Sequence, residues 1–274
     1  METTNNEIGA WVKFLSENEI PVLRQTERKL AEARQNIDHI NDREIAAIVL
    51  NDPLMTLRVL AMIRSDPRTS KVKEVTSIAH ATMMLGINPF FRQFEQLHLL
   101  EEELKRAPQA LLQMLQVVRR ARRAGTYAYN WAVWRYDPNP EEIMIAALLH
   151  DVAEILVLCF APLKAMRIHA LEKADPLLRS AQAQQEVLGF PLLELQLELC
   201  RFWNMSELMI KLMDDDHAEH PRVKTVKLAA DLARHSAHGW TDPALPDDFR
   251  EIEKLLNISP EALQVRLGLQ EGAA

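Results

Sequence analysis

The segment "EEIMIAALLHDVAEILVLCFAPL" (141–163) limits the folds open to this chain, because it is strongly apolar yet carries His150, Asp151 and Glu154 near its centre. Burying a charge costs several kcal/mol unless the charge is paired or bound to metal. The segment approaches the length of a membrane span, about 20 residues. However, ionisable groups at the centre of a span would each cost roughly 2.5–3.5 kcal/mol. We therefore expect one or two buried core helices and no membrane span.

The rest of the chain also favours helices. Its 274 residues are 48% apolar and 26% charged, with 7 glycines and 6% aromatics, a composition that suits helix better than sheet. In "DREIAAIVLNDPLMTLRVLAMIRSD" the apolar residues recur at helical spacing, and Pro53 fits the first position of a second helix. Ser77 and Gly86 are suited to cap the two ends of a further helix. The sequence therefore predicts an all-α protein.

Breaks in these patterns suggest a domain organisation. Residues 1–19 form an N-terminal helical extension, and residues 20–240 form a single domain with two helical lobes, about 20–100 and about 101–240. Residues 241–274 form a loop, a short helix and a tail, because "HGWTDPALPDDFREI" contains several turn-forming residues.

Charge and targeting signals indicate a cytoplasmic protein. The formal net charge of −7 disfavours a protein built mainly to coat nucleic acid. The start "METTNNEIGAW" lacks a basic stretch followed by an apolar one, so we expect no secretory signal. Cys159 and Cys200 lie in apolar surroundings and are expected to be reduced.

Three groups of residues could carry chemistry. His150, Asp151 and Glu154 can share one edge of a helix, but two or three groups from one helix need further ligands to hold a metal. The segment "DDDHAEH" (214–220) offers pairs at ligand spacing, and so does "ARHSAH" (233–238). The pairs are Asp216 with His220, His217 with His220, and His235 with His238. For each group we favour the ordinary alternative, a hydrogen-bonded core cluster or a solvated helix end.

A basic and aromatic segment, "VVRRARRAGTYAYNWAVWRY" (117–136), could bind nucleic acid. Its residues of interest are Arg119, Arg120, Arg122, Arg123 and Arg135 with Tyr127, Tyr129, Trp131 and Trp134. Four arginines within five residues cannot share one helix face. We therefore favour exposed charges plus one internal ion pair.

The order of the segments resembles the HDOD family, the output-type relatives of HD phosphohydrolases in bacterial signalling proteins. The resemblance runs from about Ile20 to Trp240 and is most specific at "NDPL", at "MMLGI" and at "LLHD". It implies an all-α HD-like bundle with a regulatory role and no catalysis. The sequence contains no Walker loop, G-x-S-x-G, CxxC or H-E-x-x-H motif.

The resemblance also implies that the metal site of the HD enzymes is incomplete. The slot of the earlier histidine falls near Ala121, the later histidine slot after "LGF" is Leu192, and the slot of the last aspartate lies at Asp231 or Ala230. The paired histidines are half retained, and the positions that follow the His-Asp pair are Ala153 and Glu154. We expect no metal and no cofactor. The vestigial pocket is predicted to comprise His150, Asp151, Glu154, Asp216, His217 and Asp231.

Without a metal ion, Asp151 needs another partner. Arg120 and Arg122 flank the empty slot, and we expect one of them to pair with Asp151. The leading functional hypothesis is a non-catalytic regulatory module that binds a signalling protein or a second copy of itself. The alternatives are a residual phosphohydrolase acting on a nucleotide, and a nucleic-acid-linked regulator using Arg119, Arg120, Arg122 and Arg123.

Overall fold

The computed structural model describes residues 2–65, 77–175 and 177–269, and over these ranges the chain is all-α, as predicted. Extended pairing within them is limited to an isolated bridge between Val22 and Leu99. The helices, in chain order, are α1 (Glu2–Ser16), α2 (Arg24–Gln35), α3 (Asp42–Val49), α4 (Pro53–Ser65), α5 (Ile78–Leu85), α6 (Ile87–Gln93), α7 (Leu100–Glu103), α8 (Pro108–Trp134), α9 (Pro140–Leu149), α10 (Val152–Phe160), α11 (Pro162–Ala174), α12 (Ser180–Leu188), α13 (Leu192–Phe202), α14 (Glu207–Leu212), the 3₁₀ helix η1 (Asp215–His217), α15 (Pro221–His235), α16 (Leu245–Leu256) and α17 (Pro260–Leu267).

Local signals in the sequence set many helix ends. Pro53 opens α4, where its missing N–H costs nothing. The Ser77 hydroxyl accepts a hydrogen bond from the His80 N–H and caps α5, and Gly86 ends that helix with φ +80°. Positive φ is easy for glycine because it has no Cβ. These three predictions are confirmed.

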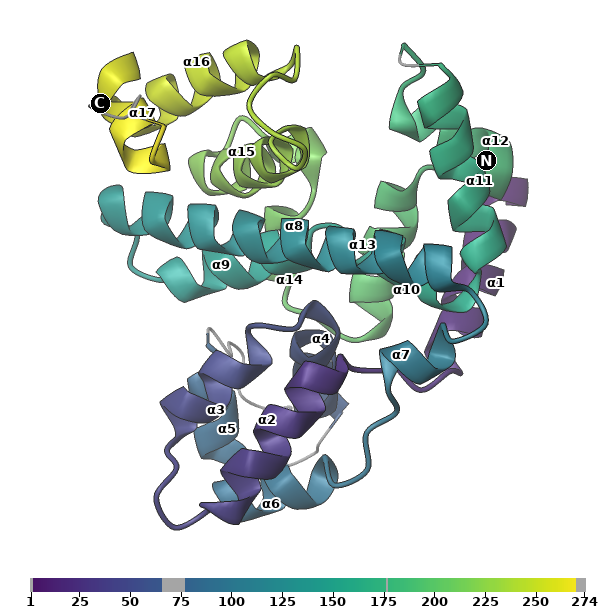
Figure 1. Ribbon diagram of the computed structural model, residues 1–274, viewed down its shortest axis with the longest axis vertical. Helices are drawn as coiled ribbons and strands as arrows, with labels where there is room; N and C mark the ends of the chain where they lie inside the picture. The colour runs from purple at the N-terminus through teal and green to yellow at the C-terminus, as the bar shows by residue number, and fades with distance from the viewer. Residues whose placement is uncertain (1, 66–76, 176, 270–274) are drawn as a thin grey trace.

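The first lobe consists of α2 to α6 and lies below the long helix α8 in Figure 1. Its two ends meet at the isolated bridge. There the Val22 N–H donates to the His98 carbonyl at 2.8 Å, and the Leu100 N–H donates to the Val22 carbonyl at 2.9 Å. The chain therefore enters and leaves this lobe at one place.

Asp52 of "NDPL" is completely buried and connects the start of α4 to the segment at Leu23, where the chain enters the first lobe. Its carboxylate accepts hydrogen bonds from the backbone N–H groups of Leu23 and Leu54, both at 2.9 Å, and of Met55 at 3.3 Å. Burial raises the pKa of Asp52, although these hydrogen bonds act in the opposite direction. The side chain thus satisfies backbone donors that would otherwise be buried without a partner.

The second lobe is organised around α8, which packs against α9 and α15 (Figure 1). Small residues on α8 allow this close approach. A Cβ added at Gly125 would lie 3.4 Å from the Met144 carbonyl oxygen and 3.5 Å from the Leu148 Cβ. Ala121, Ala124 and Ala128 are buried on the same helix.

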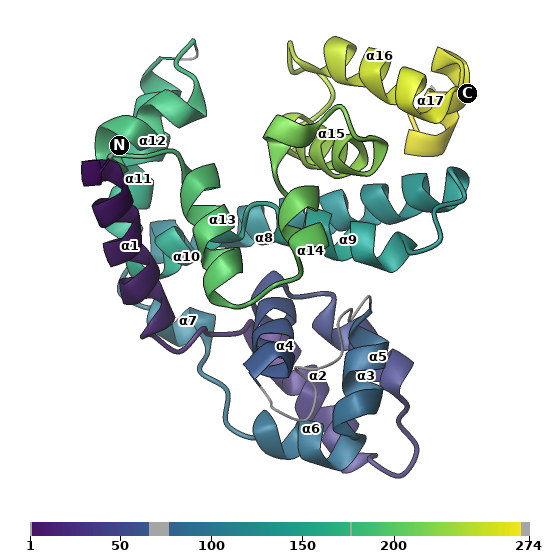
Figure 2. The same cartoon turned by 180° about the vertical axis from the view of Figure 1, so that it is seen from behind.

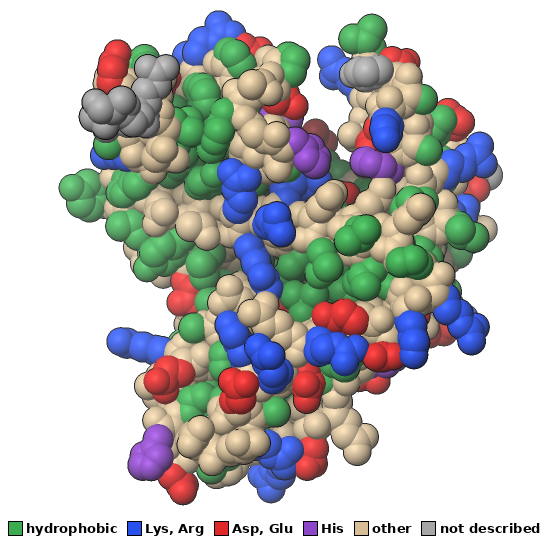
Figure 3. Space-filling model, in the orientation of Figure 1, with side chains coloured by type: hydrophobic (Ala, Val, Ile, Leu, Met, Phe, Trp, Pro, Cys, Tyr) green, Lys and Arg blue, Asp and Glu red, His purple; other side chains and the backbone are tan. Residues whose placement is uncertain are grey.

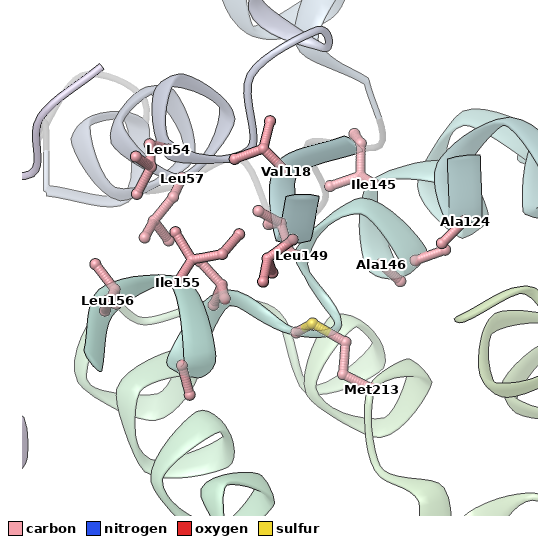
Figure 4. Packing of buried hydrophobic residues seen from close by; sticks show 14 of the residues in the cluster. Leu54, Leu57, Val118, Ala124, Ile145, Ala146, Leu149, Ile155, Leu156 and Met213 are labelled. Carbon is pink, nitrogen blue, oxygen red and sulfur yellow. The ribbon is translucent and has the colours of Figure 1, made fainter. Parts of the chain in front are cut away.

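One hydrophobic core joins the lobes. In Figure 4, Leu54 and Leu57 of α4 lie near Ile155 and Leu156 of α10, with Val118 of α8 close by. The apolar segment Pro140–Phe160 is, among the described residues, the one stretch long and apolar enough to cross a membrane, and 72% of its scored window is buried inside the protein. It forms α9 and α10, as expected for core helices.

The two ends of the chain add helices to this core. The extension α1 packs against α13, as Figure 2 shows from behind, and Trp11 contacts Phe190 edge-on at 6.4 Å between ring centroids. At the other end the prediction of a loop and one short helix was wrong, because both α16 and α17 are present. Buried Leu245 and Ile252 anchor α16 despite the turn-forming residues before it.

We predict that Asp52→Ala lowers the free energy of unfolding by about 2–4 kcal/mol, because several buried N–H groups lose their acceptor. Urea unfolding followed by circular dichroism measures the change. The matched control Asp38→Ala removes an exposed carboxylate and should change stability by less than about 0.5 kcal/mol. Equal effects of the two substitutions would contradict the assigned role of Asp52.

Candidate functional site

The centre of the opening segment is a break between two helices. α9 ends at Leu149 and α10 starts at Val152, so His150 and Asp151 occupy the junction. Buried Gln196 of α13 stabilises it, because its side-chain amide donates to the Leu149 carbonyl at 2.6 Å and accepts from the Ala153 N–H at 2.8 Å. The break turns both polar side chains toward α8, η1 and α15.

Arg120 of α8 reaches across to the junction. Its Nε and Nη2 atoms lie 3.1 and 2.8 Å from Asp151 Oδ2, and Nη2 also lies 2.5 Å from Glu154 Oε2. The side chains of Arg120 and Asp151 are 16% and 12% exposed. This is a largely buried, charge-assisted pair, the kind that is strongest when its geometry is fixed.

Helix α15 supplies a second set of charges. Arg234 Nη2 lies 3.2 Å from Asp151 Oδ1, and Arg234 Nη1 lies 3.2 Å from Asp231 Oδ1. Lys227 Nζ bridges Asp231 at 3.0 Å and Asp215 at 3.5 Å. Both oxygens of Asp151 are therefore paired with cations from different helices.

His150 lies between two carboxylates. Its Nδ1 is 3.1 Å from Asp151 Oδ1 and its Nε2 is 3.1 Å from Asp215 Oδ1. Burial favours the neutral ring, but the hydrogen bonds and charges of Asp151 and Asp215 outweigh it and raise the pKa of His150 to about 9. At neutral pH the ring is therefore protonated, and each nitrogen donates to a carboxylate.

The carboxylates respond to the same contacts. Burial acts to raise the pKa of Asp151, but Arg120, Arg234 and His150 hold it well below its usual range. Burial acts to raise the pKa of Asp215 too, but the hydrogen bond and charge of His150, together with Lys227 and Arg234, lower it. Burial raises the pKa of Glu154, with Arg120 acting in the opposite direction. We call the eight side chains the ion-pair cluster: Arg120, His150, Asp151, Glu154, Asp215, Lys227, Asp231 and Arg234.

The ion-pair cluster does not fit a divalent metal ion of the kind that HD phosphohydrolases use. A histidine binds metal only as the neutral ring, so a metal ion would first have to displace the proton that Asp151 and Asp215 stabilise on His150. The oxygens of Asp151 face Arg120 and Arg234, and Ala121 offers no ligand. Within the described part of the chain, no group of three or more His, Cys, Asp and Glu side chains has a metal-binding arrangement.

The structure decides between the two expected arginines and corrects the acidic end of the predicted pocket. Arg120, and not Arg122, contacts Asp151; Arg122 donates to the Asn51 carbonyl of the first lobe instead. Asp216 and His217 are exposed, and both contact Asp214, which caps η1: its carboxylate accepts from the Asp216 N–H and lies 3.0 Å from His217 Nδ1. Asp215 contacts His150 in their place.

Sequence reasoning missed Asp215, Lys227, Arg234 and Gln196. A signal existed for two of them, because Lys227 and Arg234 lie at i−4 and i+3 from Asp231 and so share its helix face. The remaining histidine candidates have other roles. His235 binds Asp248 of α16 at 2.6 Å, and His220 caps α15.

The arginines of α8 point in different directions. Arg119 is exposed, Arg120 is in the ion-pair cluster, and Arg122 contacts the first lobe. Arg123 donates to the Ser236 carbonyl at 3.1 Å and to the Tyr127 hydroxyl at 2.8 Å. The four side chains therefore do not form one basic surface for nucleic acid.

The helical fold and the charged cluster at the His150–Asp151 junction are those of an HD-type domain. The family model for the HDOD domain matches residues 20–219. The chain therefore belongs to the HDOD family, which is related to the HD phosphohydrolases. Asp231 and Arg234 lie beyond the matched residues.

Several solved structures share the fold. The MmoQ response regulator of Methylococcus capsulatus is 17% identical with a TM-score of 0.70, over 93% of this chain and 99% of that one. The virulence factor cj0248 of Campylobacter jejuni is 20% identical with a TM-score of 0.66, over 94% and 93%. An HDOD domain protein of unknown function from Geobacter sulfurreducens is 18% identical with a TM-score of 0.52, over 97% and 94%. A comparison with curated protein sequences gives no match.

We predict that Arg120→Ala lowers the free energy of unfolding by about 3–5 kcal/mol, because it leaves buried carboxylates short of a partner. Arg122→Ala, which removes one hydrogen bond at the lobe contact, should cost about 1 kcal/mol. Chemical unfolding of both variants measures the difference. In a double-mutant cycle with Asp151→Asn, Arg120→Ala should be non-additive and Arg122→Ala additive. Additivity for Arg120 would contradict the pair.

We also predict that stability falls as the pH rises from about 6.5 to 9. The pKa of His150 is about 9 in the folded chain against an ordinary 6.5, so its contribution is complete below pH 6.5 and is lost as the pH passes 9. The total is about 3 kcal/mol. Thermal unfolding across this range should show a flatter profile for His150→Gln.

The matched control for this pH profile is His235→Gln. Its hydrogen bond to Asp248 also raises the pKa of His235, so this residue adds to the slope in the same direction. The His150→Gln variant should flatten the profile in both the wild-type and the His235→Gln backgrounds. A profile unchanged by His150→Gln would show that the ring is neutral in the folded protein.

Proposed function

We propose that this chain is a non-catalytic regulatory module that acts by binding another protein chain. The observation that carries the proposal is the pairing of Asp151 with Arg120 and Arg234, while His150 donates to two carboxylates. In an HD hydrolase a bound metal ion activates water by lowering the pKa of that water. Here the oxygens of Asp151 face Arg120 and Arg234, and a guanidinium group cannot supply a metal-bound hydroxide.

Membership in the HDOD family supports a role in bacterial signal transduction. A cytoplasmic location is part of the proposal. It is supported by the burial of the apolar segment inside the protein and by two buried, unpaired cysteines. Burial raises the pKa of the Cys200 thiol to about 12, so this thiol is protonated and unreactive at neutral pH.

The competing function is a residual metal-dependent phosphohydrolase acting on a nucleotide. It would require His150 to lose its proton and Arg120 to leave Asp151 before a metal ion could bind. The raised pKa of His150 opposes the first change, and the ion pair of Arg120 with Asp151 opposes the second. A nucleic-acid-linked role is weaker still, because the arginines of α8 are dispersed.

We predict that the purified protein carries less than stoichiometric Zn, Fe, Mn or Mg and hydrolyses no nucleotide above background. Elemental analysis and hydrolysis assays with added Mn²⁺ or Mg²⁺ test this directly. One equivalent of metal that is lost in His150→Ala, or turnover that disappears in Asp151→Ala, would overturn the proposal.

A sharper variant of this test removes the competing cation. If the ion pair excludes the metal, Arg120→Ala should bind Mn²⁺ more tightly than the wild type, while Arg122→Ala should not. Titration calorimetry on the folded variants measures this difference. Tight Mn²⁺ binding by the wild type would count against the proposal.

A further inference from the structure

The outer face of α8 carries a regular pattern that the fold uses at one position, Arg122, whose side chain donates to the Asn51 carbonyl of the first lobe. α8 has 27 residues and is therefore about 40 Å long. Along its outer side, seven residues recur at alternating spacings of three and four, the heptad spacing of helices that pair. We call them the α8 seam: Leu112, Leu115, Arg119, Arg122, Thr126, Tyr129 and Val133.

The seam is open to solvent although most of its residues are apolar or aromatic. Leu112 is 64% exposed, Leu115 39%, Tyr129 40% and Val133 44%. Arg119 is exposed and has no hydrogen-bond or ion-pair partner among the described residues. In Figure 3 apolar side chains lie on both sides of basic ones along this part of the molecule. A seam of this kind is typical of a helix that meets another helix.

We propose that the α8 seam binds the same seam of a second copy, with the two helices antiparallel about a two-fold axis near residue 124. The inference rests on the proposed function, because a module that acts by binding needs a surface for it. In this register the residues that face each other have numbers that sum to 248. The layers are Leu115 with Val133, Arg119 with Tyr129, and Arg122 with Thr126, each occurring twice.

This register places no arginine directly opposite another arginine. Arg119 faces the ring of Tyr129, where a cation–π contact is favourable, and the apolar ends of the seam meet each other. A parallel pair in register would place Arg119 against Arg119. An antiparallel pair shifted by one heptad would place Arg119 against Arg122. Like charges in direct opposition are unfavourable and so disfavour both alternatives.

Tyr136 gives a second reason for this arrangement. It follows the end of α8 with φ +55° and is 93% exposed. A tyrosine rarely adopts this left-handed conformation, where glycine or asparagine is usual. In the proposed register Tyr136 faces Leu112 of the second copy, so the exposed ring gains an apolar partner.

The test is sedimentation equilibrium of the full chain over a range of concentrations. Because the contact is one pair of helices, we expect a dimer that dissociates on dilution. Leu115→Glu and Val133→Lys should each weaken it at least tenfold. The double variant Leu115→Glu with Val133→Lys should recover much of this loss, because only the antiparallel register places each new glutamate against a new lysine. The matched control Leu163→Glu changes a leucine that is 86% exposed on α11 and should leave the dimer unchanged.

Cross-linking tests the register independently, since both native cysteines are buried. With a short bismaleimide, Thr126→Cys should give a covalent dimer, because the two copies of this position lie about 6 Å apart along the axis. Leu112→Cys should not, because its two copies lie about 36 Å apart. A monomer at all concentrations, a failed charge rescue, or equal disruption by Leu163→Glu would overturn the inference. None of these outcomes would alter the metal and hydrolysis results that test the proposed function.

Discussion

The buried carboxylate of Asp151 is the constraint on which this lobe depends. A lone negative charge at the junction of α9 and α10 would cost several kcal/mol. Its compensation comes from three places: Arg120 on α8, Arg234 on α15 and the neighbouring His150. The two arginine contacts each fix one helix, α8 or α15, relative to the junction. Replacing such a cluster with well-packed hydrophobic residues is often neutral or stabilising. The main consequence of the cluster is therefore the arrangement of the helices.

Helix α8 connects this arrangement to the rest of the molecule. Within five residues it sends Arg120 to the ion-pair cluster, Arg122 to the first lobe and Arg123 to the corner between α15 and α16. Arg119 remains on the outer face. Since neighbouring residues on a helix differ by about 100°, one short basic segment contacts three different parts of the protein. A rotation of α8 would disturb all of these contacts together.

The sequence predicted the all-α fold, the capped ends of α5 and the start of α4, because those features depend on local chemistry. The choice between Arg120 and Arg122 depended on the rotation of α8. That rotation could not be read from the sequence, because apolar residues share the face of both arginines: Val117 and Ala124 for Arg120, and Val118 and Gly125 for Arg122. The choice among Asp214, Asp215 and Asp216 could not be read either, because a single 3₁₀ turn sets which side chain faces His150. No local sequence pattern predicts a 3₁₀ turn at that place.

An ion-pair cluster differs from a metal site in one respect that matters for the proposed binding module. A bound metal ion dissociates, so the helices around it respond to the supply of metal and to chelators. The guanidinium groups of Arg120 and Arg234 are covalently attached and stay charged at all physiological pH values. The orientation of α8 is therefore set by groups that belong to the chain itself. The fixed orientation also applies to the outer face of α8, because Arg120 and the α8 seam belong to one rigid helix. A surface that always has the same orientation needs no ligand to become competent for binding.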